Sequence, residues 1–186
     1  MHTPFQPSEQ VWATLEAMNE ASHRGQPFFF ILDFELQEGV FVLEPLQHHD
    51  GSLFFAFPTA KTPDPIGTKG KLTLTPSPEA PKRYAERFDI IHRGLMRGDS
   101  FLTNLTIRTP IETEASLADI YLSSEATYRV LLPGRFVSFS PECFVKLQGY
   151  ELATHPMKGT IDARIPDAAE KLRADYKEGC EHYTIV

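Results

Sequence analysis

Residues 127–155 read TYRVLLPGRFVSFSPECFVKLQGYELATH, and this stretch decides the fold class. Short apolar-rich runs are separated by turn residues such as Gly149, which is the pattern of short strands joined by tight turns. The spacing predicts four strands, over residues 127–132, 135–140, 142–147 and 150–155. Strands connected by such short turns run antiparallel.

Helices and further strands are predicted on the N-terminal side of this stretch and beyond it. The predicted helices cover residues 8–24, 79–97, 116–123 and a last segment that begins near Asp167 and is still running at Val186; the further strands cover residues 28–34, 40–43, 52–57, 71–74 and 101–108. Helices separated by groups of antiparallel strands favour an α+β fold over a doubly wound parallel sheet.

The helix predicted over residues 79–97 has clear end signals and a clear apolar stripe. Ser77 is expected to cap it with Pro78 at its first position, and Gly98 is expected to end it. The stripe expected to be buried is made of Tyr84, Phe88, Ile91 and Leu95. The first helix has similar signals, with Ser8 as the expected cap and Gly25 at the end.

The composition limits the classes of partner. The chain has 186 residues, 41% of them apolar, and a net charge of −7, which argues against nucleic acid or an anionic membrane as the main partner. No apolar run approaches the roughly 18 residues needed to span a bilayer. Two cysteines, Cys143 and Cys180, are too few for a disulfide framework, so a cytoplasmic location is expected.

The last residues, Tyr183-Thr184-Ile185-Val186, lack the glycine, basic turn or polar tail that usually closes a helix. We therefore expect the chain to be the front part of a longer protein. The alternative is a natural helical C-terminus that docks on the core.

Lys158 lies in His-Pro-Met-Lys-Gly-Thr, residues 155–160, between a rigid Pro156 and a Gly159 that lets the backbone approach a bound molecule. A free lysine has a pKa of about 10.4 and is not nucleophilic near neutrality. Burial or a nearby cation would lower that pKa and release the amine as a nucleophile or base. The alternative is a surface lysine in a turn.

Glu142 precedes Lys158 by sixteen residues. If residues 142–155 form a hairpin that turns at Gln148-Gly149, Glu142 lies opposite His155 and close to Lys158. A carboxyl group there could act as a general acid if its pKa were raised. The alternative is a solvated glutamate at the start of a strand.

Glu178 and Glu181 are three residues apart in the last predicted helix and share one face. Such a carboxylate pair could hold magnesium, which takes one or two protein carboxylates together with substrate oxygens. The alternative is a solvated helix face with an ion pair between Lys177 and Glu181.

Four ordered motifs together resemble the chorismate-utilising enzymes, and within them component I of aminodeoxychorismate synthases. The motifs are residues 94–106 (GLMRGDSFLTNLT), 139–144 (FSPECF), 154–160 (THPMKGT) and 177–186 (KEGCEHYTIV). The resemblance covers roughly residues 88–186. It implies the N-terminal part of that family's fold, with mostly antiparallel sheets and helices on the outside.

The resemblance also implies roles for individual residues. Lys158 matches the lysine that attacks the chorismate ring and displaces its hydroxyl group before ammonia displaces the lysine. Anthranilate synthases and many isochorismate synthases carry a small residue, usually Ala, at that position. Glu142 matches the general acid for the departing hydroxyl group.

The binding groups follow from the same resemblance. Gly159 and Thr160 match positions that hold a substrate carboxylate, Glu181 matches a magnesium ligand, and Glu178 matches a carboxylate beside it. Magnesium is therefore the implied cofactor, chorismate the implied substrate, and a glutamine amidotransferase the implied partner that supplies ammonia.

The expected organisation is a single, incomplete chorismate-binding domain over residues 1–186. Its N-terminal helix and strands occupy residues 1–78, and its motifs occupy residues 79–186. In the family, the motif at 177–186 is followed by a further long stretch with more of the site, so this chain alone is expected to be inactive. The alternatives are an isochorismate or anthranilate synthase-like enzyme, or a non-catalytic fragment that pairs with a separate C-terminal half.

Overall fold

The computed structural model of the protein describes residues 6–47, 49–100, 102–139, 143, 145–155 and 161–185. Its elements are, in chain order, α1 (Glu9–His23), β1 (Phe28–Leu32), β2 (Gly39–Leu43), β3 (Phe54–Phe57), β4 (Ala60–Lys61), β5 (Thr75–Pro76), α2 (Pro81–Arg97), β6 (Ile111–Glu112), α3 (Leu117–Ser123), β7 (Arg129–Leu132), β8 (Phe136–Phe139), β9 (Lys146–Gln148), β10 (Glu151–Ala153), α4 (Ala168–Ala174) and α5 (Tyr176–Ile185). All strand pairs among these elements are antiparallel, which confirms the α+β class.

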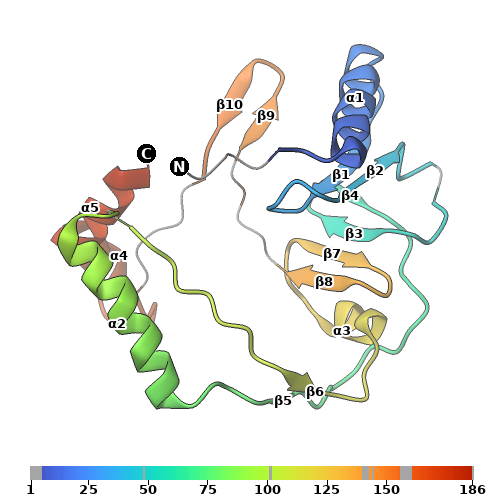
Figure 1. Ribbon diagram of the computed structural model, residues 1–186. Coiled ribbons are helices and arrows are strands. Elements are labelled where there is room, and N and C mark those ends of the chain that lie inside the picture. The colour runs from blue at the N-terminus through green and yellow to red at the C-terminus, as the bar shows by residue number, and fades with distance from the viewer. Residues whose placement is uncertain are drawn as a thin grey trace.

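One part of the chain is packed in layers, at the right of Figure 1. A four-stranded sheet in the order β4-β3-β7-β8 lies between the β1–β2 hairpin on one face and α3 on the other, and α1 covers the hairpin. The core side chains between the sheet and the hairpin are Leu53, Phe55, Val130 and Leu132, packed against Phe29, Ile31, Val40 and Val42. Because side chains alternate along a strand, Leu131 does not join this cluster and is buried beside α3 instead.

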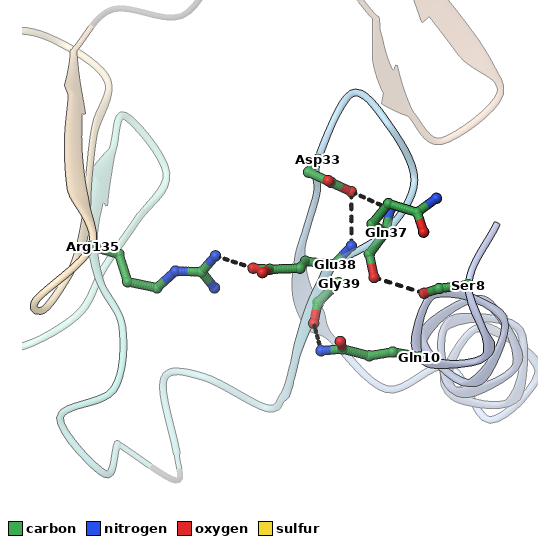
Figure 2. Close-up of polar contacts among 7 residues, drawn as sticks. All are labelled: Ser8, Gln10, Asp33, Gln37, Glu38, Gly39 and Arg135. Atoms are coloured by element: carbon green, nitrogen blue, oxygen red, sulfur yellow. Dashed lines mark hydrogen bonds and ion pairs between the residues drawn. The ribbon is translucent and has the colours of Figure 1, made fainter. Parts of the chain in front are cut away.

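Polar contacts hold α1, the β1–β2 turn and the β7–β8 turn together (Figure 2). Asp33 Oδ1 accepts hydrogen bonds from the backbone N–H groups of Gln37 at 2.7 Å and Glu38 at 2.9 Å, and so shapes the turn. Ser8 Oγ donates to the Gln37 carbonyl oxygen at 2.7 Å. Glu38 forms an ion pair with Arg135, 97 positions along the chain.

Gly39 lets α1 approach the β1–β2 hairpin closely. A Cβ atom at this position would lie 2.5 Å from Thr14 Oγ1 and 3.2 Å from Leu32 Cδ2, both closer than normal contact. Gln10 Nε2 donates to the Gly39 carbonyl oxygen at 3.1 Å, so the helix is fixed at this short separation.

Local end signals place the short helices as predicted. Ser8 caps α1, its Oγ accepting from Val11 N–H at 3.2 Å, and Gly25 follows the helix with a φ of 66°. Ser116 and Asp119 form a reciprocal capping box at the start of α3.

The start of α2 differs from the prediction, whereas its end agrees with it. The N-cap is Ala80, which offers no side-chain hydrogen bond, and Pro81 takes the first helical position that was predicted for Pro78. Ser77 instead donates its backbone N–H to the Pro110 carbonyl oxygen at 2.9 Å. This bond extends the β5–β6 pair and delays the helix by about one turn. Gly98 ends the helix in the left-handed conformation, with a φ of 82°.

The predicted burial of the α2 stripe is wrong for the described structure. No residue of α2 is buried, and the side chains of Tyr84 and Phe88 are 47% and 49% exposed. Within the described part of the chain, no Cα atom of another helix or strand lies within 8 Å of an α2 Cα atom. Ile91 and Leu95, in the second half of the stripe, are half-buried, so the exposure is greatest at Tyr84 and Phe88.

Several predicted strands are shorter than expected or do not form. β1 ends at Leu32, residues 71–74 and 102–108 are not strands, and β9 begins at Lys146 instead of residue 142. Phe101, the first residue of the strand predicted over residues 101–108, lies outside the described residues. Strands need a neighbour to take their backbone hydrogen bonds, and no described strand pairs with residues 102–108.

The last predicted helix is two helices, α4 and α5, separated at Asp175. Asp175 is extended, with φ −73° and ψ 115°, and its Oδ1 accepts a hydrogen bond from Glu178 N–H at 3.0 Å. An aspartate that bonds to the backbone three residues later starts a new helix, so it divides what the apolar pattern predicts as one.

Candidate functional site

Some of the residues predicted to carry the chemistry lie within the described part of the chain, and others lie outside it. Glu142, Lys158, Gly159 and Thr160 lie outside the described residues, so their predicted roles stay predictions. Glu178 and Glu181 are described, and both lie on α5. The described neighbours of the predicted site include His155, which is exposed, and Cys143, which is half-buried and free.

The hairpin that was predicted to bring Glu142 near Lys158 is shorter than expected. β9 and β10 pair Lys146 with Ala153, Leu147 with Leu152 and Gln148 with Glu151, and the paired strands extend no further in either direction. The predicted pairing would place Lys146 opposite Glu151, so the observed register is shifted by two residues. A two-residue shift keeps each side chain on its original face. The turn predicted at Gln148-Gly149 is wrong, whereas the predicted opposition of Glu142 and His155 stays a prediction, because Glu142 lies outside the described residues.

The turn of this hairpin explains the register shift. Gly149 has a φ of 62°, a conformation that side chains disfavour, and Gly149 and Tyr150 together form the turn. The turn was predicted one residue earlier, at Gln148 and Gly149. Moving a turn by one residue moves the register of the whole hairpin by two.

The α5 carboxylates form a compact cluster with Lys177. Lys177 Nζ lies 3.0 Å from Glu178 Oε1 and 3.2 Å from Glu181 Oε1. The side chain of Lys177 is 74% exposed, whereas those of Glu178 and Glu181 are 20% and 32% exposed. The hydrogen bond to Glu178, followed by the one to Glu181, raises the pKa of Lys177. The Lys177–Glu181 ion pair weighed as the alternative in the sequence analysis is therefore present.

The oxygen atoms of Glu178 and Glu181 are the groups in this cluster that could bind a magnesium ion. Both carboxylates hold one cation, the Lys177 ammonium group, and magnesium prefers such hard oxygen ligands. Among the described residues, no group of three or more His, Cys, Asp or Glu side chains is placed to hold a metal. Two carboxylates are the number of protein ligands that magnesium commonly takes, and their role as its ligands stays a prediction.

A second polar region that the sequence analysis did not single out lies beside β5, β6 and α3, at the bottom of Figure 1. It is a hollow of about 540 Å³ whose lining includes Lys71, Thr113, Glu112 and Asp119. Asp119 Oδ1 accepts a hydrogen bond from Thr68 N–H at 2.6 Å, and this bond, followed by those from Ser116, lowers the pKa of Asp119. These contacts hold the loop that contains Thr68 against α3, so Asp119 has a structural role here.

No helix among the residues that the structure describes is both long enough and apolar enough to cross a bilayer.

Comparisons with known proteins found one matching family and several similar proteins. The protein family described as "chorismate binding enzyme" matches the chain over residues 46–186. The chain is similar to an uncharacterized PabA-like protein of Pasteurella multocida, at 37% identity over 179 residues, which are 94% of this chain and 54% of the relative. The chain thus spans about half the length of that relative.

Two further relatives have names that state an activity. Anthranilate synthase component 1 of Streptomyces coelicolor is 33% identical over 142 residues, covering 68% of this chain and 27% of the relative. Aminodeoxychorismate synthase component 1 of Salmonella typhimurium is 26% identical over 159 residues, covering 78% of this chain and 35% of the relative. No solved structure matches the chain. Because the family match covers well over half of its residues, the chain belongs to the chorismate binding enzyme family.

Proposed function

We propose that the protein acts as component 1 of an aminodeoxychorismate synthase, which converts chorismate and ammonia to 4-amino-4-deoxychorismate on the route to p-aminobenzoate and folate. The observation that carries the proposal is Lys158 within the motif at residues 154–160, inside the family match at 46–186. The similarity to the Salmonella typhimurium enzyme of that name supports the same branch.

The proposed chemistry is a substitution in two steps. The neutral amine of Lys158 attacks the chorismate ring, forming a C–N bond as the C–O bond to the ring hydroxyl group breaks. Glu142 gives its proton to the departing hydroxyl group, which leaves as water. Ammonia then attacks, and the bond to Lys158 breaks as the new C–N bond forms. Covalent catalysis divides one difficult substitution into two easier ones.

Binding of the substrate falls to other residues of the chain. Chorismate carries two carboxylates, and the backbone of Gly159 and the hydroxyl group of Thr160 are proposed to donate to one of them. Glu178 and Glu181 are proposed to hold magnesium, which would offset substrate charge in this acidic chain when bound. The ammonia is proposed to come from a glutamine amidotransferase subunit, with the whole assembly in the cytoplasm.

A second candidate function is an anthranilate synthase-like activity. The similarity to the Streptomyces coelicolor enzyme, at 33% identity, favours it. Lys158 argues against it, because the resemblance places a small residue at this position in that branch.

The deciding experiment identifies the product. The coding sequence is first read through and past Val186, and the protein it encodes is incubated with chorismate, ammonium and magnesium. Chromatography is expected to find 4-amino-4-deoxychorismate, and anthranilate as the main product would contradict the proposal. Lys158→Ala is expected to lose most of the turnover. Wild-type turnover by Lys158→Ala with ammonia would show that Lys158 is not the nucleophile.

A further inference from the structure

Asp175 is the single residue between α4, which ends at Ala174, and α5, which begins at Tyr176. Its carbonyl oxygen accepts the first hydrogen bond of α5, from Gly179 N–H at 3.0 Å. Its Oδ1 accepts a second hydrogen bond from Glu178 N–H, also at 3.0 Å. An extended residue whose backbone and side chain both accept from the start of a helix is the N-cap of that helix. Asp175 therefore caps α5.

The aspartate at the start of α4 lacks such a contact. Asp167 is the N-cap of α4, but its backbone is left-handed, with a φ of 58°, and its side chain makes no cap hydrogen bond. Two consecutive helices thus begin at the same residue type, and of these two aspartates only Asp175 holds the first turn of its helix with its carboxylate. Capping is therefore a property of position 175 and not of every aspartate beside a helix.

The turn that Asp175 caps carries part of the charged cluster of α5. Lys177 and Glu178 lie in this first turn, and Glu181 lies in the next one. Lys177 Nζ is 3.0 Å from Glu178 Oε1 and 3.2 Å from Glu181 Oε1, so the two carboxylates hold one cation. Side chains three residues apart share a face only while the backbone between them is helical. The cluster therefore depends on an intact first turn.

The first turn of a helix frays easily, because its N–H groups have no acceptors within the helix. In α5 the cap bond of Asp175 goes to the N–H group of Glu178 itself. Loss of this bond would let the first turn open and would move Glu178 away from Glu181. The cap therefore controls the separation of the two carboxylates.

Asp175 acts through Glu178 and is not placed as a third ligand. Among the described residues, no three His, Cys, Asp or Glu side chains are grouped so that they could hold a metal ion. The Oδ1 atom of Asp175 is engaged by Glu178 N–H. The negative charge of Asp175 also suits the N-terminus of a helix, where the helix dipole is positive. These observations assign Asp175 to the support of the carboxylate pair.

We propose that Asp175 is a positioning residue for the magnesium site. By capping α5, it keeps Glu178 and Glu181 at the separation at which the two carboxylates bind one magnesium ion. The inference rests on the proposed function, in which these two glutamates are the magnesium ligands. It does not depend on which product the enzyme forms from chorismate.

Three variants of this chain separate the cap from the charge. Asp175→Ala removes both, whereas Asp175→Asn and Asp175→Ser keep a capping oxygen without the charge. In titration calorimetry with magnesium chloride, Asp175→Ala is expected to bind about three- to tenfold more weakly than the unaltered chain, and the other two variants within about twofold of it. Unchanged affinity in Asp175→Ala would overturn the proposal. Equal losses in all three variants would also overturn it, because they would trace the effect to the charge.

A second measurement tests the cap without magnesium. Amide hydrogen exchange of Glu178, followed by nuclear magnetic resonance, is expected to be faster by at least about threefold in Asp175→Ala, because its N–H group loses its acceptor. Asp175→Asn is expected to restore the slow exchange. A Glu178 amide that stays equally protected in Asp175→Ala would show that the first turn of α5 does not need the cap, and the proposal would fail.

Two controls separate positioning from a general loss of structure. Asp167→Gly removes the corresponding side chain at the start of α4, and glycine keeps the left-handed backbone there. Its magnesium affinity is expected to equal that of the unaltered chain, and a loss as large as in Asp175→Ala would contradict the proposal. Urea unfolding followed by the fluorescence of Trp12, the one tryptophan of the chain, is expected to be the same in all variants.

Failure of the proposed magnesium ligands gives a different result. If Glu178→Gln and Glu181→Gln bind magnesium as tightly as the unaltered chain, these glutamates are not the ligands, and their proposed role fails together with this inference. If both of these variants lose magnesium binding but Asp175→Ala keeps it, the ligands stand and only the positioning role of Asp175 fails.

Discussion

Phe55 and Phe88 are both phenylalanines, and they lie in two contrasting regions of the molecule. Phe55 is 3% exposed in β3 and stacks on Phe29 at 5.3 Å, inside the layered region of α1, the β1–β2 hairpin, the four-stranded sheet and α3. Phe88 is 49% exposed on α2, which belongs with β9, β10, α4 and α5 to the outlying elements. The difference shows that an apolar pattern predicts that a residue can be buried, whereas burial itself depends on a neighbouring surface.

The largest expected effect tests this comparison directly. Phe55→Ala in this chain is expected to lower the free energy of unfolding by about 3–5 kcal/mol, because it removes a buried ring and leaves a cavity. Phe88→Ala is expected to change it by less than about 0.5 kcal/mol, as for other exposed positions. Urea denaturation followed by circular dichroism measures both values. Similar losses in the two variants would mean that α2 is part of the stable core.

Two glycines repeat the comparison at the level of the backbone. Gly39→Ala is expected to destabilise the chain by about 1–3 kcal/mol, because the new Cβ would clash with Thr14 Oγ1 at 2.5 Å. Gly94→Ala in α2 meets only Asp99 Oδ2 at 3.4 Å and Arg97 Nη2 at 4.0 Å. It is expected to favour the helix by about 0.5–1 kcal/mol. Thermal melts and the helical circular dichroism signal report the two effects, and a destabilised Gly94→Ala would reveal hidden packing on α2.

Acid is expected to weaken the layered region through Asp119. Hydrogen bonds from Thr68 N–H and Ser116 lower its folded pKa below 3.8, so the carboxylate stabilises the fold above that pH. This contribution begins to fall when the pH drops below about 4, the pKa of an aspartate in the unfolded chain, and it is lost once the pH is below the lowered folded pKa. Asp119→Asn is expected to flatten this part of the stability–pH curve, measured by denaturation at several pH values.

Asp162 supplies the control for this acid effect in the outlying region. Its pKa is also lowered, by hydrogen bonds from Arg164, but these join residues only two apart in the chain. Asp162→Asn is expected to leave the pH dependence of core unfolding unchanged. An equal flattening in both variants would mean that the acid effect does not come from the link between Thr68 and α3.

The smallest expected effect concerns the cation held on α5. Lys177→Met removes the ammonium group that occupies Glu178 and Glu181, so magnesium should bind a few-fold more tightly, as expected for the loss of one exposed ion pair. Titration calorimetry with magnesium chloride measures this, with Lys171→Met on α4 as the charge-matched control. Equal affinity in the two variants would argue against these two glutamates as the magnesium ligands.

Local signals predicted much of the layered region. Ser8 and Ser116 cap the helices that were predicted to start beside them, and the apolar run that begins at Phe28 forms the predicted strand, β1. These features depend on neighbours a few residues away, which the sequence displays. The i,i+4 spacing likewise predicted the Lys177–Glu181 ion pair as one of two alternatives.

Other predictions failed where a distant partner decides the outcome. The stripe that includes Tyr84 and Phe88 has the pattern of a buried helix, but none of its residues is buried among the described residues. Residues 102–108 alternate as a strand does, but no described strand pairs with them. The roles of Glu142, Lys158, Gly159 and Thr160 stay predictions, because these residues lie outside the described part of the chain.

The sequence by itself determined the α+β class, most helix ends and, through its ordered motifs, the resemblance to chorismate-utilising enzymes. Only the tertiary structure decided that Phe55 is buried and Phe88 is not, that Gly39 must lack a side chain, and that the β9–β10 register is shifted by two residues. The physical reason is the distance along the chain over which each interaction acts. Caps, turns and periodicity act over a few residues, whereas burial and strand pairing join segments such as β3 and β7, which lie far apart in the chain.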